Sequence, residues 1–205
     1  QASLRVQQFG TLIAGGRLER ETADSFSQNV APSPGPKTRT LAADQVTGSV
    51  FALWQWPVTE RFTVSLGGRY DKVSDAGAFP TARVTMAYRI PETGTKLRAS
   101  LGTGAKAPTL FQRFSPQFGT QDLNPERSVG VDAGIDQDLF DGRVTLSATV
   151  FANRFRNLIN FVSGPPCLAT QFGCYVNVQR ASTSGVELSG RAILRCVAIW
   201  EDLSP

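Results

Sequence analysis

The chain has 205 residues, of which 41% are hydrophobic, so it contains enough apolar material to fold. Its net charge is +4, but Lys and Arg are scattered along the chain and form no cluster, which argues against a nucleic-acid partner. It contains no histidine, which excludes a Ser-His-Asp hydrolase and a histidine-based zinc site, and we expect neither enzymatic activity nor a cofactor. No apolar run is long enough for a transmembrane helix, so a membrane role would require a β-barrel.

Side chains alternate between apolar and polar in segment after segment, which is the pattern of strands with one apolar face. In residues 62–71, Phe62, Val64 and Leu66 share one face, and the opposite face is largely polar. The fold class that we predict is all-β, an antiparallel meander of about eight strands. In chain order the strands are expected near residues 11–21, 46–56, 62–71, 82–90, 96–103, 128–137, 143–152 and 175–191.

The connections between these segments are of two kinds that take turns along the chain. Residues 56–60, 91–95 and 138–142 are tight turns rich in Pro, Gly and Asp, whereas residues 21–44, 106–127 and 157–174 are long and polar. Residues 72–79 form an intermediate loop in a long-loop position. In a meander this order places all short turns at one rim and all long loops at the other, as in outer-membrane barrels.

Aromatic residues agree with this orientation. On the apolar faces, Trp54, Trp56, Phe62 and Tyr88 lie at the short-turn ends of their segments. Tyr70 lies at the opposite end of its strand, about 27 Å from Phe62 at ~3.3 Å per residue, close to the height of an apolar membrane band after tilt. Strands of a soluble sandwich alternate too, but such a sheet has no reason to place aromatics at both strand ends.

Four blocks of sequence resemble the barrel region of TonB-dependent outer-membrane receptors, most closely cobalamin and iron-siderophore receptors. They read LRASLGTGAKAPTLF, DLNPERSVGVDAGID, VTLSATVFANRFRNLINF and YVNVQRASTSGVELSG, and the resemblance covers roughly residues 46–190. It implies one part of a barrel of about twenty-two strands in the bacterial outer membrane. It also implies active uptake of a scarce metal-chelate or cobalamin-like ligand, driven by TonB through a separate plug domain. A passive porin or small structural barrel remains the alternative.

Eight residues match the family motif: Lys106, Ala107, Pro108, Asn124, Pro125, Glu126, Gly185 and Glu187. The first six are interpreted as the architecture of the loop base, and direct contact with the ligand is the alternative. The stretch GTGAKAP also resembles a phosphate-binding loop, but Lys106 is followed by Ala107, where that loop requires Ser or Thr. We expect Pro108 to end strand pairing there.

Candidate ligand contacts lie at the predicted outer tip of the loop after residue 106. They are Phe111, Arg113, Phe114, Gln117 and Phe118, because exposed aromatics beside a cation suit a flat or chelated anionic ligand. The same residues can equally pack the loop on itself.

Two cysteines, Cys167 and Cys174, lie in one predicted extracellular loop, where a disulfide would limit the open states of the loop. We expect them to form a disulfide, and Cys196 to remain unpaired. Two thiols without further ligands do not complete a zinc site.

The polar faces of the strands are expected to line the barrel lumen and to pair with each other or with the plug. They include Arg69, Asp71, Arg83, Arg98, Asp132 and Glu187. Residues 1–191 are assigned to a partial receptor barrel. Residues 192–205 no longer alternate, and we interpret them as an aberrant tail from a truncation or frame shift. About eight strands do not close a wide barrel, so an open sheet is expected.

Overall fold

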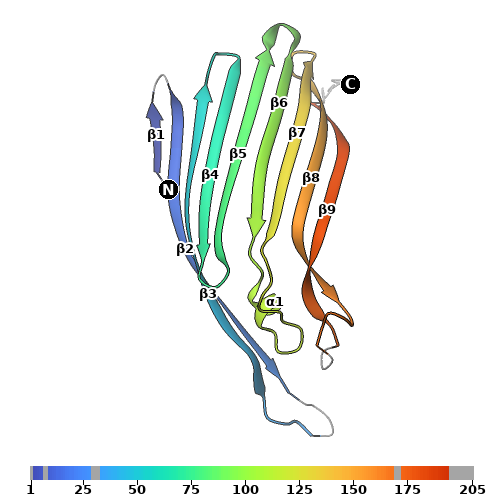
Figure 1. Ribbon diagram of the computed structural model, residues 1–205. Coiled ribbons are helices and arrows are strands. Elements are labelled where there is room, and N and C mark those ends of the chain that lie inside the picture. Colours follow the sequence, from blue (N-terminus) through green and yellow to red (C-terminus); the bar gives the residue numbers. More distant parts are fainter. Residues whose placement is uncertain (1, 7–8, 29–32, 169–171, 194–205) are drawn as a thin grey trace, which may run out of the picture.

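A computed structural model describes residues 2–6, 9–28, 33–168 and 172–193 of the chain. These residues form one sheet of nine antiparallel strands that follow one another in sequence order (Figure 1). The strands are β1 (Ala2–Val6), β2 (Gly10–Ser27), β3 (Thr38–Pro57), β4 (Phe62–Val73), β5 (Gly77–Ile90), β6 (Thr95–Lys106), β7 (Glu126–Leu139), β8 (Val144–Val162) and β9 (Cys174–Ala192). The predicted all-β meander is confirmed, and the sheet is open because β1 and β9 do not pair with each other.

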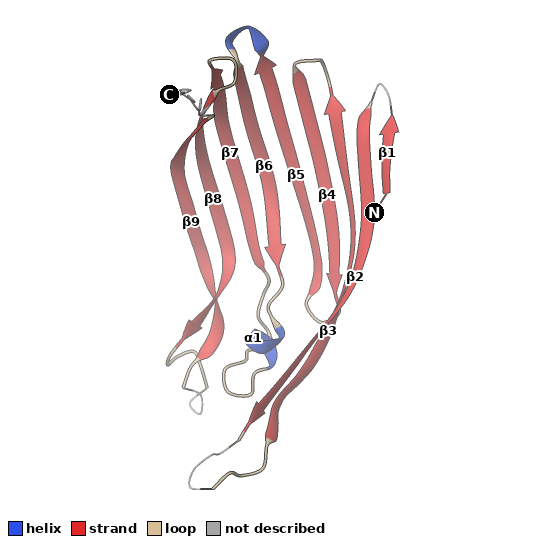
Figure 2. Cartoon of the chain, turned by 180° about the vertical axis from the view of Figure 1, so that it is seen from behind, coloured by secondary structure: helices blue, strands red, loops and turns tan. Residues whose placement is uncertain are grey.

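The two rims of the sheet differ as the sequence predicts. The turns after β3, β5 and β7 are short and lie at one rim, whereas the connections after β2, β6 and β8 lie at the other rim (Figure 2). The turn after β5 is a short 3-10 helix, Pro91–Thr93, which ends at Gly94 with a φ of 67° that favours glycine. There Arg61 donates to the carboxylate of Glu92 at 2.5 Å. The pKa of Glu92 is lowered, chiefly by a hydrogen bond from its own backbone N–H and to a smaller extent by the hydrogen bond from Arg61.

Some predicted boundaries are wrong at the long-loop rim. Much of the expected loop 21–44 is strand, because β2 and β3 stay paired from Glu21 opposite Gln45 to Ser27 opposite Thr38, and this ladder projects beyond its neighbours (Figure 1). Likewise β8 continues to Val162 inside the expected loop 157–174, and the intermediate loop 72–79 reduces to residues 74–76. The residues of β2 in the β2–β3 extension are mostly polar and hid it, since backbone pairing does not itself require apolar alternation.

Backbone register places the apolar side chains of all the central strands on one face. In one row across the sheet, Val64 lies opposite Met86, followed by Ala99, Ala133, Val150 and Val186. Large side chains of this face are uncovered: Leu101 is 52% exposed and Leu188 is 78% exposed. A soluble sandwich would bury these residues, so their exposure supports a face that meets lipid.

The aromatic residues lie where the sequence analysis places them on this outer face. At the short-turn end Trp54 and Trp56 stack with ring centroids 5.3 Å apart, and Phe62 lies 6.5 Å from Tyr88. Tyr70, at the other end, is 46% exposed. Four aromatics at one end and Tyr70 at the other thus border the apolar band, in the positions of barrel girdles.

Buried apolar residues gather at the long-loop rim. Leu41, Val73 and Phe79 are buried. Their register places them on the inner face of the sheet, whereas Val50 and Tyr70 lie on the outer face. Leu110 and Leu123, in the β6–β7 connection, are also buried. No described helix is long and apolar enough to cross a membrane. The middle of the sheet thus has no compact core of its own within the described residues.

The orientation of the two faces predicts opposite responses to a new charge. In the complete barrel that carries this sequence, folded into phospholipid vesicles, Leu101→Arg should lower the free energy of unfolding by about 2–4 kcal/mol, because Arg would enter the apolar band. Ser65→Arg, on the inner face beside the same row, should have a much smaller effect. Urea titration followed by tryptophan fluorescence measures both, and equal losses would contradict the assignment of faces.

Candidate ligand-binding loops and luminal face

A short helix that the sequence analysis missed opens the β6–β7 connection. Helix α1 (Leu110–Phe114) begins at Thr109, whose hydroxyl accepts from the backbone N–H of Gln112, while the Gln112 side chain accepts from the backbone N–H of Thr109. This reciprocal capping box was visible as Thr-x-x-Gln after Pro108. Pro108 and Leu110 are fully buried, and α1 contacts β3 and β2 (Figure 2). As expected, strand pairing ends before Pro108.

Aromatic rings join the β6–β7 connection to the end of β8 and the start of β9. Phe111 meets Tyr175 edge-on at 6.3 Å, and Phe118 meets Phe161 edge-on at 5.6 Å. Phe161 and Tyr175 are in turn 5.4 Å apart, and the backbone N–H of Tyr175 donates to Phe118 at 3.1 Å. Two of the five candidate ligand contacts thus pack one loop against the other. Phe111 nevertheless stays 43% exposed.

The remaining candidates form a cationic and polar surface beside this cluster. The guanidinium of Arg113 lies over the Phe114 ring, 4.7 Å from its centroid, and its Nε donates to the carbonyl of Gln121 at 3.3 Å. The Nη1 of Arg113 is buried and has no hydrogen-bond partner among the described residues. Gln117 is exposed. The arrangement can present a ring face, an amide and a cation to a ligand.

Motif residues at the base of this loop connect four strands. Lys106 lies 3.5 Å from the carboxylate of Glu126, which also accepts from the backbone N–H of Ile159 at 2.9 Å. Asn124, next to Pro125, exchanges hydrogen bonds with the side chain of Asn177 at 2.8 and 2.9 Å. The sequence analysis missed Asn177, because nothing local marks a side chain whose partners lie 53 residues away.

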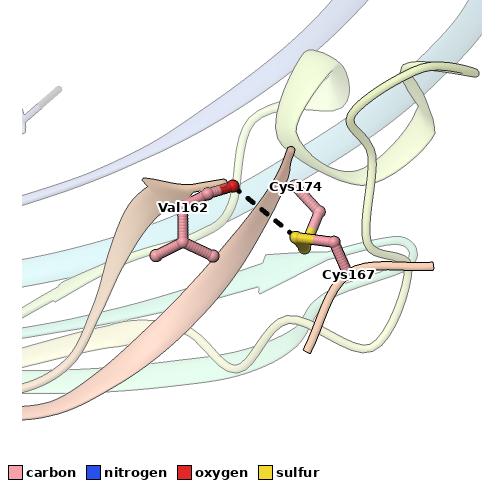
Figure 3. The surroundings of a disulfide bond; sticks show 3 residues. All are labelled: Val162, Cys167 and Cys174. Atoms are coloured by element: carbon pink, nitrogen blue, oxygen red, sulfur yellow. Dashed lines mark hydrogen bonds between the residues drawn. A yellow bond between two sulfur atoms is a disulfide. The ribbon is translucent and has the colours of Figure 1, made fainter. Parts of the chain in front are cut away.

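The two loop cysteines form a disulfide in the structure. Cys167 and Cys174 have Cα atoms 5.5 Å apart, Cys174 is buried, and the Cys167 sulfur approaches the carbonyl oxygen of Val162 at 3.5 Å (Figure 3). The bond therefore ties the loop to the end of β8 and the start of β9. Cys196 lies outside the described residues.

The inner face carries a network of charged and polar side chains around a hollow of about 580 Å³. Arg98 donates to Asp136 at 3.2 Å and to Thr149 at 2.6 Å. Phe151 lies against Gly185, where an added Cβ would come within 2.9 Å of the ring, so the motif glycine makes room for it. The hollow is lined by, among others, Arg83, Arg98, Ser100, Asp132, Phe151 and Glu187.

Luminal charges pair with each other in part. Arg69 and Asp71 form an ion pair at 2.7 Å that also includes the hydroxyl of Ser49. Ser100 donates to Asp132. Glu187, in contrast, makes no ion pair within the described residues, although it lines the same hollow. The inner face therefore keeps polar groups available for a second layer of protein.

The chain matches the family described as TonB dependent receptor-like, beta-barrel, over residues 1–204. It belongs to this family of TonB-dependent receptors. The vitamin B12 transporter BtuB of Vibrio cholerae is 33% identical over 132 residues, which are 62% of this chain and 20% of that protein. An iron-regulated outer membrane virulence protein of the same organism is 27% identical over 151 residues, 65% of this chain and 23% of that protein.

Solved structures of TonB-dependent receptor type share the fold. The siderophore receptor PirA from Pseudomonas aeruginosa superimposes with a TM-score of 0.74 at 18% identity, covering 91% of this chain and 37% of that one. The copper transporter OprC gives 0.73 at 18% identity, covering 94% and 34%. This TonB-dependent receptor barrel thus lies in the outer membrane, and the chain spans about a fifth of the length of the curated relatives it matches.

The hydrogen bonds of Asn177 predict the effect of its loss. Asn177→Ala removes bonds to both backbone groups of Asn124 and to the carbonyl of Asn157, so the complete barrel should lose about 1–3 kcal/mol of stability and the amide of Asn124 should exchange faster. Hydrogen–deuterium exchange of the peptide containing Asn124 measures this effect. Asn160→Ala, at an exposed position, is the control, and equal exchange in both variants would show that Asn177 does not hold the loop.

Proposed function

We propose that this chain forms one sector of the barrel wall of a receptor for active uptake of a scarce ligand, an iron-siderophore or a cobalamin-like molecule. The observation that carries the proposal is a sheet with an exposed apolar outer face and a polar inner face, in a chain of the TonB-dependent receptor family. The vitamin B12 transporter and the iron-regulated protein among its relatives support the ligand class. The role is binding and transport rather than catalysis.

The inner face supports a plug as the immediate partner of this sector. Arg83, Arg98 and Glu187 converge on one hollow, and strands alone satisfy only part of their charge. A plug domain would cover this hollow, supply further polar partners and carry the contact with TonB across the periplasm. Outer-membrane lipid is the partner of the opposite face. Within the described residues β1 and β9 each pair on one side only, so the proposed barrel needs strands beyond these nine.

The loop rim supports ligand capture by the β6–β7 connection. Phe111 and Gln117 are exposed, and Arg113 with Phe114 supplies a cation over a ring. We assign these four residues to ligand contact and Phe118 to packing between the loops, because Phe118 lies against Phe161. The disulfide and the Asn124–Asn177 bonds would hold this surface in place before the ligand arrives, which lowers the entropic cost of binding.

Loss of the Arg113–Phe114 pair should weaken ligand binding. In the complete receptor, Arg113→Ala with Phe114→Ala should reduce binding of ferric enterobactin or cyanocobalamin, whichever the intact receptor binds, by about tenfold or more, as expected for losing a desolvated cation and a ring. Cell-surface binding of the radiolabelled ligand measures the change. The matched control removes another cation–ring pair, Lys37→Ala with Phe26→Ala in the β2–β3 extension. Unchanged binding, or an equal loss in the control, would contradict this assignment.

Dependence on energy separates the active receptor from a passive pore. Uptake of the same ligand into cells at nanomolar concentration should be lost in a strain without TonB, whereas surface binding should persist, because capture precedes the driven step. A passive porin would give uptake that rises linearly with concentration and does not change when TonB is deleted. That result would contradict the proposed active receptor and favour a passive porin.

A further inference from the structure

Four arginines lie side by side on the outer face of the sheet near the long-loop rim. Arg127 of β7 lies opposite Arg156 of β8, which lies opposite Arg180 of β9, so three of them form one row across three strands. Arg154 lies two residues from Arg156 on the same face, and all four side chains are exposed. We call these four residues the arginine patch.

The arginine patch faces outward, on the same side as the apolar band. Strand residues alternate between faces, so Arg127 shares its face with Val129 and Val131, which are 49% and 50% exposed. By the same alternation Arg154 and Arg156 follow Val150 and Ala152 along β8. The patch therefore continues the lipid-facing surface and is separate from both the lumen and the loop assigned to ligand contact.

No carboxylate on this face neutralises the arginine patch. On the described parts of β5 to β9, every Asp and Glu within the paired rows alternates to the inner face, including Glu126, Asp132 and Glu187. The ion pairs of the described residues likewise involve none of the four arginines. Like charges in adjacent strand positions destabilise a sheet, so the patch requires an anion from outside this part of the chain.

The height of the patch corresponds to the lipid headgroups. Along β8, Arg154 is ten residues from Val144, the first residue after the short turn, which is roughly 33 Å at ~3.3 Å per residue. With a strand tilt of about 40° this becomes about 25 Å along the membrane normal, the height of the apolar band. The arginines thus lie just beyond the band, on the side of the long extracellular loops.

A hollow of about 370 Å³ lies beside the patch on the same surface. Pairing between β5 and β6 stops at Arg83 opposite Gly102, and beyond that point Pro80 and Thr103 form walls of the hollow. Arg127, Arg154 and Arg156 line its charged side, and Val129 adds an apolar surface. Cations above an apolar floor match an amphiphile whose head is anionic and whose tail lies against the band.

We propose that the arginine patch binds the phosphate groups of lipid headgroups in the outer leaflet. The planar guanidinium of Arg holds a phosphate through two parallel hydrogen bonds, so adjacent arginines on three strands can bind two or more phosphates of one lipid. The bound lipid fixes the sheet at the level of the headgroups. This inference depends on the membrane placement of the sheet and is independent of which ligand the receptor takes up.

The test compares two triple variants of the complete barrel, purified in detergent. One is Arg127→Gln, Arg156→Gln and Arg180→Gln; the other removes the same charge near the short-turn rim, by Arg89→Gln, Arg143→Gln and Arg191→Gln. Native mass spectrometry with added bisphosphorylated lipid A, monophosphorylated lipid A or phosphatidylethanolamine measures lipid binding. Heat-modifiable electrophoretic mobility shows separately whether each variant forms a barrel. A variant without this mobility shift has failed to fold, and this outcome is distinct from loss of lipid binding by a folded barrel.

We expect wild type and the short-turn variant to retain bisphosphorylated lipid A over phosphatidylethanolamine, with intermediate retention of the monophosphorylated form. The patch variant should bind bisphosphorylated lipid A about 10- to 100-fold more weakly, given the contribution of each cation at a membrane surface. Equal binding by the patch variant and wild type, or an equal loss in the short-turn variant, would overturn the proposal. Full displacement of lipid A by millimolar inorganic phosphate would also overturn it and assign the patch to a free anion.

Discussion

Register is the constraint on which this structure depends. Side chains alternate with a period of two, so a slip of one residue between any two strands would move a whole apolar set from the outer face to the inner one. The pairing avoids this across the sheet, since Leu66 lies opposite Val84, which lies opposite Leu101, which lies opposite Val131. The same ladders pair the backbone groups of neighbouring strands across the apolar band, which is what a lipid environment demands. Alternation of side chains in a fixed register thus produces both the apolar outer face and the polar inner face.

Stability at the long-loop rim has a different origin. Beyond the bilayer the sheet meets water, and there the chain buries Leu41, Phe79 and Leu110, closes a disulfide and joins its loops through Asn177. Such a rim resembles a small soluble domain built on a membrane sheet: it combines hydrophobic burial with satisfied polar groups. The proposed ligand surface lies on this part, which explains how a loop can be both exposed and well defined.

The sequence was sufficient for what depends on local periodicity and insufficient for what depends on distant partners. Alternation placed Phe62, Val64 and Leu66 on the correct face, and turn residues located the short rim. The extension of β2 and β3 was missed, because ladders with polar faces carry no hydrophobic signal, and β1 was missed because five residues are too few for a periodic pattern. Thr109 and Gln112 form a capping box that indicates the start of helix α1, but the helix was not predicted because the chain was expected to be all-β. The ligand-contact residues are a prediction that rests on the chemistry of their side chains.

The inner and outer faces of the sheet differ in how their charged side chains are paired, and this difference decides which partner each face requires. Inside, Arg98 meets Asp136 and Arg69 meets Asp71, so opposite charges lie side by side on that face. Outside, the arginine row has no acidic neighbour on the described strands, and Val186 and Leu188 of the edge strand β9 are 65% and 78% exposed. In water the like charges of the arginine row would repel each other, and an exposed edge at β9 would be prone to aggregation. A membrane with phosphate at its surface, and a further strand beside β9, removes both problems at once, so the outer surface is complete only within a closed barrel in its own bilayer.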